Sequence, residues 1–137
     1  MANFQKLQLA LDEFNREFPR PNMAMLALSE EYNILKDFRN SYPGASYPGV
    51  YAIFDVSGEL LRLGKASCNS TIGARLSTYF RWHDVDYIGV NKHEGYENAK
   101  IIRTIKIPNE RAFEAPALEE FLIRKLSPKF NTLGCTK

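Results

Sequence analysis

The sequence predicts an α+β fold: a small three-stranded antiparallel sheet flanked by helices, with an N-terminal helical extension. Three patterns indicate this class. The chain opens with an apolar stripe at helical spacing, its middle holds two β-rich segments joined by Ser57-Gly58, and an amphipathic helical segment lies near its end. A hairpin and one further strand, covered by helices, form layers around one core.

The N-terminal segment is predicted to be a helix that ends before Pro19. Its apolar residues recur three and four positions apart: Phe4, Leu7, Leu11, Phe14 and Phe18. Such a stripe packs on the body of a domain, and the alternative is a helix that binds a partner or a second copy. A second helix is predicted over 29–40, because Ser29 can cap it and two glutamates favour its positive end.

The remaining elements follow from turn residues and apolar periodicity. The tetrapeptide Ser-Tyr-Pro-Gly occurs at 41–44 and again at 46–49, and it marks a loop before the hairpin. The predicted segments are then strands over 49–55 and 59–64, a helix over 71–82, a long loop over 83–98 that can hold a short strand near Tyr87, a strand over 100–107 and a helix over 116–126.

Size and composition describe a globular chain of 137 residues with 45% apolar and 25% charged residues. We divide it into a helical extension over 1–48, a main domain over 49–131 and a tail over 132–137. The net charge of +2 is too small to indicate a nucleic-acid partner. The chain has no membrane-length apolar run and no secretion signal, and its two cysteines lack metal-ligand spacing. A cytoplasmic protein is expected.

Two charged residues interrupt apolar helical faces. Arg75 lies beside the stripe of the segment 71–82, and Glu119 lies beside that of the last helix. Charges near a core are costly unless they are paired or used. One interpretation is a buried Arg75–Glu119 ion pair, or edge positions with the charged tips in water. The other is a concave site in which Glu119 holds a divalent cation and Arg75 holds a phosphate.

Tyr51 lies on the first strand of the hairpin. A strand tyrosine fills a core or an interface in most proteins. It can also donate or accept a proton if a neighbouring cation lowers the pKa of its phenol.

The ordered set of motifs resembles the GIY-YIG nuclease domain. The set consists of Gly49-Val50-Tyr51, a hairpin, Arg62-Leu63-Gly64-Lys65-Ala66, a helix with Arg75, and Glu119-x-x-Leu122-Ile123 followed by Pro128 and Asn131. No single piece is specific, whereas the order of the whole set is. The resemblance covers residues 49–131.

The resemblance implies a metal-dependent endonuclease that acts on DNA. Tyr51 matches the family's tyrosine that serves as general base or holds the attacking water. Arg75 matches the arginine that stabilises phosphate charge, and Glu119 matches the glutamate that binds one Mg²⁺ or Mn²⁺ ion. The substrate implied is duplex or branched DNA.

Three further positions carry expected roles by the same resemblance. Tyr79 matches a position at which relatives have His or Tyr near the scissile phosphate. Gly64 matches the glycine of the second motif, where a side chain would obstruct the site, and Asn131 matches the Asn that braces it.

The second motif departs from the family, because Arg62 occupies the position of its tyrosine. A guanidinium cannot act as a base at neutral pH, although it can bind phosphate. The chemistry then depends on Tyr51 alone, is altered or is lost. A literal Tyr-Ile-Gly occurs at 87–89, beyond the Arg75 helix, and we interpret it as a chance match. A weaker hypothesis is that Tyr87 folds back and supplies the missing phenol.

Basic residues around such a site would bind the DNA backbone. With Arg62, Gly64 and Asn131, Lys65 completes the predicted substrate-binding set, and further basic residues follow at Lys100, Arg103 and Lys106. An ordinary solvated surface is the alternative for these charges. For the whole chain, the alternatives to an endonuclease are a catalytically inactive module that binds nucleic acid or protein, and a domain whose helices over 1–40 form an oligomer.

Overall fold

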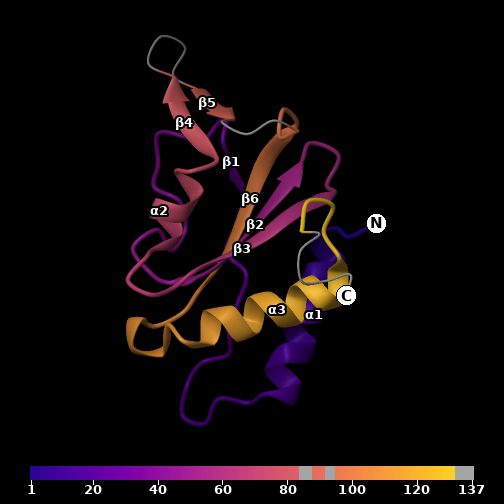
Figure 1. The fold of residues 1–137 in the computed structure, drawn as a ribbon, viewed down its shortest axis with the longest axis vertical. Coiled ribbons are helices and arrows are strands. Elements are labelled where there is room, and N and C mark those ends of the chain that lie inside the picture. Colours follow the sequence, from indigo (N-terminus) through magenta and orange to yellow (C-terminus); the bar gives the residue numbers. More distant parts are fainter. Residues whose placement is uncertain (84–87, 92–94, 132–137) are drawn as a thin grey trace.

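The central feature of the fold is a four-stranded antiparallel sheet with the strand order β1-β6-β2-β3 (Figure 1). A computed structural model describes residues 1–83, 88–91 and 95–131 and the side chains of 1–80 and 95–131; the predicted tail over 132–137 lies outside these residues. The elements are α1 (Phe4–Glu17), β1 (Tyr32–Asn33), β2 (Gly49–Asp55), β3 (Leu60–Ala66), α2 (Ile72–Leu76), β4 (Phe80–His83), β5 (Ile88–Asn91), β6 (Ala99–Lys106), the 3₁₀ turn η1 (Asn109–Arg111) and α3 (Glu114–Leu126).

The predicted hairpin is confirmed as β2 and β3. Asp55 holds its turn, because one carboxylate oxygen accepts hydrogen bonds from the backbone amides of Ser57 and Glu59 at 2.9 and 3.0 Å. The register places Tyr51 directly opposite Gly64. Strand β6 pairs with the other edge of β2, as expected for the third strand, and β3 remains at the edge of the sheet.

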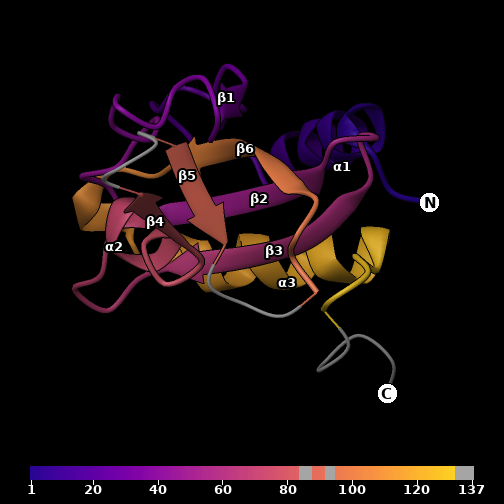
Figure 2. The same cartoon turned by 90° about the horizontal axis from the view of Figure 1, so that it is seen from above.

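The sheet separates two apolar cores. Figure 2 shows the helices α1 and α3 together on one side of its strands. On one face, α1 and α3 pack together, and the rings of Phe14 and Phe121 meet edge to face with centroids 5.3 Å apart. The apolar stripe of α1 therefore faces the body of the domain, as predicted. On the other face lie α2 and the chain around β1. Among the described residues, no helix combines the length and the apolarity needed to cross a membrane.

The predicted helix over 29–40 is wrong. Residues 32–33 instead form β1, which pairs with β6 and adds a fourth strand to the three predicted. The side chain of Asn33 accepts the backbone amide of Leu35 at 2.9 Å, and Asp37 accepts the amide of Asn33 at 3.0 Å. These local bonds replace helical ones. The edge of β6 carries backbone N–H and C=O groups that are free to pair with another strand, and residues 32–33 pair with them.

The predicted helix over 71–82 is too long, whereas the short strand allowed within the loop over 83–98 is present as β5 at Ile88–Asn91. Helix α2 stops at Leu76, where the hydroxyls of Ser77 and Thr78 bind the carbonyls of Gly73 and Arg75 at 2.9 and 2.7 Å. Side-chain bonds of this kind compete with helix propagation. The chain then forms β4, which pairs with β5 in a separate two-stranded sheet.

Candidate active site

Two buried tyrosines form the centre of the site. Tyr51 is 1% exposed, and its hydroxyl donates a hydrogen bond to the hydroxyl of Tyr79 at 3.3 Å. Tyr51 comes from β2, and Tyr79 comes from the turn that joins α2 to β4. The two rings lie 5.7 Å apart, tilted by 59°. The structure thus brings together two predicted site residues that are far apart in the sequence.

Gly64 leaves the space that the Tyr51 ring occupies. A Cβ atom at this position would lie 2.1 Å from both Cζ and Oη of Tyr51. Real Cβ contacts essentially never come below 3.0 Å, so any larger residue must displace the ring. The glycine of the second motif is therefore required locally by the tyrosine of the first.

Tyr51 is a neutral phenol in this fold. Burial raises the pKa of Tyr51 well above its ordinary value, and the hydrogen bond to Tyr79 raises it further. The charges of Arg75 and Arg62 lower the pKa, but by less. The condition under which this phenol would accept a proton, a lowered pKa, is not met.

Glu119 provides a half-buried carboxylate surrounded by positive charge. Burial raises the pKa of Glu119 above its ordinary value, and the charges of Lys65, Arg62 and Arg75 oppose that shift in decreasing order. Strand β3 is at the sheet edge, where side chains from both of its faces can reach α3. Lys65 lies on the face that α3 covers, and Arg62 lies on the opposite face.

The buried Arg75–Glu119 ion pair is wrong. Arg75 is exposed on α2. No hydrogen bond or ion pair joins these two side chains in the part of the chain that the structure describes. The edge-position interpretation fits Arg75, whose guanidinium is available to a ligand from solution.

Arg62 lies in an aromatic pocket together with Tyr96, which sequence reasoning missed. Its guanidinium carbon lies 5.9 Å from the centroid of Tyr79, and Nη1 donates to the carbonyl of Phe130 at 3.2 Å. The ring of Tyr96 packs between Tyr79 and Phe130, at 5.5 and 4.7 Å. Burial raises the pKa of Tyr96, and the adjacent Arg62 opposes that shift. No motif marks Tyr96, because it comes from a polar segment far from Arg62.

Two further predictions concern Tyr87 and the basic residues of the third strand. Tyr87 lies outside the residues that the structure describes, so the hypothesis that it supplies a phenol stays a prediction. Of the basic residues on the third strand, Arg103 stacks on the ring of Phe4 at 4.1 Å and donates to the carbonyl of Ser29. Lys106 lies over the ring of Tyr47 at 4.9 Å. These two cations contact the N-terminal half of the chain.

Asn131 binds the backbone of β3. Its side-chain oxygen accepts the amide of Leu63 at 2.7 Å, and its side-chain nitrogen donates to the carbonyl of Leu63 at 2.9 Å. The amide of Phe130 also donates to the carbonyl of Leu61 at 2.8 Å. The segment after α3 thus covers the free edge of β3, between the neighbours Arg62 and Gly64.

We expect Asn131→Ala to destabilise the protein by about 1–3 kcal/mol, because it leaves a buried amide and carbonyl of Leu63 unpaired. Urea unfolding measures the loss, and hydrogen exchange at the Leu63 amide locates it. The exposed Asn98 offers the matched control Asn98→Ala. A free energy of unfolding for Asn131→Ala within about 0.5 kcal/mol of wild type, the range of neutral surface changes, contradicts the bracing role.

The residues fit a divalent cation only in one mode. In the described part of the chain, no group of three or more His, Cys, Asp or Glu side chains could hold a metal. Glu119 has no hydrogen-bond or ion-pair partner among the described residues, so its carboxylate oxygens are available. Mg²⁺ keeps several waters and binds through one or two carboxylates plus substrate phosphates. A single carboxylate beside phosphate-binding cations fits that mode.

The fold and the site together define a nuclease-type domain: a hairpin with paired Tyr51 and Gly64, an arginine on the next helix, and a glutamate on the last. A family model described as "UvrC-like GIY-YIG domain" matches residues 47–132. The chain therefore belongs to the UvrC-like GIY-YIG family, which confirms the resemblance found over 49–131.

Curated relatives give the same result. The chain is 34% identical over 89 residues to the UvrABC system protein C of Nautilia profundicola, covering 63% of this chain and 14% of that protein. It is 37% identical over 108 residues to the protein of the same name from Chlamydia abortus, covering 72% of this chain and 15% of that protein. This chain thus spans about one seventh of the length of these relatives. No solved structure matches it.

Proposed function

We propose that this chain is a divalent-metal-dependent DNA endonuclease that hydrolyses phosphodiester bonds in duplex or branched DNA. The carrying observation is the half-buried carboxylate of Glu119, which has three cations around it and no bonded partner among the described residues. A lone carboxylate in a site of net positive charge suits a phosphate and a metal ion together.

Each charged residue has a distinct role in this proposal. Glu119 would hold Mg²⁺ or Mn²⁺, which when bound supplies Lewis-acid stabilisation of charge on a phosphate oxygen. Arg75, exposed on α2, binds the phosphate undergoing attack and stabilises its added negative charge. Lys65 binds the DNA backbone beside the site. Fixed donors of this kind act without reorganising during the reaction.

Both tyrosines have orienting roles in this proposal. Tyr51 is buried, neutral and hydrogen-bonded to Tyr79, so it positions the Tyr79 hydroxyl. Arg62, stacked on Tyr79, fixes that ring from the other side and adds positive charge where the family has a tyrosine. We assign Tyr79 to the placement of water or phosphate oxygen and Tyr51 to a positioning role.

Cleavage of supercoiled plasmid and of labelled branched DNA tests the proposal. We expect nicking with Mg²⁺ or Mn²⁺, none with EDTA, and recovery when the metal is restored. Nicking that persists in EDTA contradicts the metal-dependent mechanism. Absence of nicking by folded protein on both substrates contradicts the endonuclease.

One observation favours a second candidate, a catalytically inactive module that binds nucleic acid or protein. The Arg62 side chain is held by the ring of Tyr79 and by the carbonyl of Phe130. A guanidinium cannot take over the proton transfer of the phenol that the family has at this position. This candidate predicts DNA binding that weakens steeply with salt and is not followed by cutting. Binding and nicking measured at the same salt concentrations separate the two functions.

A further inference from the structure

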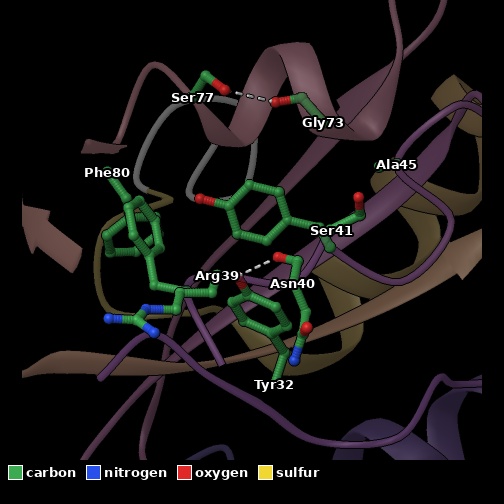
Figure 3. Close-up of a pocket in the computed structure, with 10 residues that line it drawn as sticks. Tyr32, Arg39, Asn40, Ser41, Ala45, Gly73, Ser77 and Phe80 are labelled. Carbon is green, nitrogen blue, oxygen red and sulfur yellow. Dashed lines mark hydrogen bonds between the residues drawn. The ribbon is translucent and has the colours of Figure 1, made fainter. Parts of the chain in front are cut away.

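A pocket lies on the side of α2 that faces away from the candidate active site. Its volume is about 990 Å³, near the upper end of the roughly 300–1,000 Å³ typical of small-molecule sites. Figure 3 shows Gly73 and Ser77 of α2 on one side of it and Tyr32 and Asn40 on the other. It is lined by Tyr32, Phe38, Arg39, Asn40, Ser41, Tyr42, Ala45, Gly73, Ser77 and Phe80.

Aromatic rings form much of the pocket lining. Tyr42 packs between Tyr32, at a centroid distance of 4.8 Å, and Phe38, at 6.5 Å. The hydroxyl of Tyr32 is fixed by its hydrogen bond to the carbonyl of Asn40 at 2.8 Å (Figure 3). Phe80, which is 2% exposed, adds a fourth ring. Packing and hydrogen bonding therefore fix the orientation of the aromatic rings that line the pocket.

Polar groups around these rings remain available to a ligand. The hydroxyls of Tyr42 and Ser41 and the side-chain amide of Asn40 make no hydrogen bond within the described residues. Burial raises the pKa of Tyr42, so its hydroxyl is neutral and can donate or accept. Neutral donors and acceptors thus surround an aromatic surface.

One short segment separates this pocket from the candidate active site. Successive helical residues turn by about 100°, so Gly73 and Ser77 share the pocket side of α2, and Arg75 lies on the other side. The residues after α2 are divided in the same way between the two sides. Tyr79 contacts Tyr51 in the candidate site, whereas Phe80 lines the pocket. Arg75 and the pocket are therefore separated by the width of one helix, roughly 10 Å. A nucleic-acid strand bound at Arg75 can reach the pocket within a few nucleotides.

We propose that this pocket binds an unpaired nucleobase of the DNA strand held at the active site. This inference rests on the proposed function, because it takes DNA as the ligand. Bases stack on aromatic side chains whatever their sequence, since every base has a π face. Asn40, Ser41 and Tyr42 supply hydrogen bonds to the base edge. The substrate class indicated is DNA with unpaired bases near the cut, such as a branch, a bubble or a single-stranded end.

The test uses the full chain in EDTA with a single-stranded oligonucleotide that carries 2-aminopurine at one position. Ser41→Phe fills the pocket from an exposed position. Ser46→Phe is the matched control, because Ser46 starts the second Ser-Tyr-Pro-Gly, is also exposed and does not line the pocket. Circular dichroism verifies that both variants are folded, and Tyr42→Phe tests the hydroxyl while keeping the ring.

We expect saturable quenching of 2-aminopurine by wild type and Ser46→Phe, and binding weakened about tenfold by Ser41→Phe, the scale of losing one stacked base. An abasic oligonucleotide should bind wild type and Ser41→Phe equally. Equal binding of the 2-aminopurine strand by all variants overturns the pocket proposal. So does equal affinity for a fully paired duplex, or loss of binding with the abasic strand as well.

Cleavage by the same variants separates the two proposals. If wild type and Ser41→Phe cut branched DNA equally and bind the 2-aminopurine strand equally, the endonuclease stands and the pocket proposal fails. If wild type never cuts but Ser41→Phe still abolishes quenching, the pocket proposal stands and the endonuclease fails.

Discussion

Glu119→Gln is expected to abolish DNA cleavage while leaving the protein at least as stable as wild type at pH 7. The substitution removes the proposed metal-binding charge and keeps the shape of the side chain. We expect a rate loss of about a hundredfold or more, the scale of losing one group that stabilises transition-state charge. Plasmid nicking with Mg²⁺ measures the rate.

The stability change follows from the direction of the pKa shift. Burial raises the pKa of Glu119 in the folded state above the ordinary value of 4.5, so ionisation at neutral pH costs folding free energy. That cost is absent below the unfolded pKa and develops as pH rises through the folded pKa. Glutamine does not ionise. The melting temperature of the variant should therefore exceed that of wild type at pH 7 and match it below about pH 4.

The adjacent Glu120→Gln is the matched control. Glu120 is exposed and lies next to Glu119 on α3, so this variant loses one charge without touching the proposed ligand. It should cut DNA like wild type. A drop in the stability of Glu119→Gln at pH 7 would show that this carboxylate is a structural partner, and cleavage at the wild-type rate would remove it from the mechanism.

Gly64→Ala is expected to destabilise the fold and to disrupt the paired tyrosines. The new Cβ atom would lie 2.1 Å from the Tyr51 ring, which is buried and hydrogen-bonded to Tyr79. Overpacking of this kind costs about 1–3 kcal/mol. We expect a loss of that size in urea unfolding, together with a large loss of cleavage.

A double-mutant cycle isolates the cause. Tyr51→Leu removes the ring atoms that the new Cβ would meet, so adding Gly64→Ala to that background should cost little. Tyr51→Phe keeps Cζ in place and should not relieve the clash. If Gly64→Ala costs the same free energy with tyrosine and with leucine at position 51, the steric account fails.

The fold was predictable where a local pattern decides the structure. The stripe of α1, the Asp55–Glu59 turn and the apolar face of α3 each follow from residues close together in the sequence. Helix α1 and the hairpin begin and end close to their predicted residues. The segment around Tyr32 misled the prediction, because its local caps and charges suit a helix, whereas the open edge of β6, some seventy residues later, makes it a strand.

The roles of the candidate site residues stay predictions, but the structure explains one of the positions that the resemblance named. A side chain at Gly64 would meet the ring of Tyr51. The resemblance did not indicate Tyr96, because no motif places it beside Arg62. Residue chemistry allowed Tyr51 to transfer a proton if a cation lowered the pKa of its phenol, whereas burial raises that pKa.

By itself, then, the sequence determined the hairpin, the helices α1 and α3, and which polar residues stand out from apolar faces. Hydrophobic periodicity and turn residues act between residues that are close in the sequence, so they can be recognised before the fold is known. Only the tertiary structure decided the fourth strand, the shortened α2, the exposure of Arg75, the neutral state of Tyr51 and the pocket beyond α2. These properties depend on burial and on which distant segments meet, and both arise only when the whole chain packs.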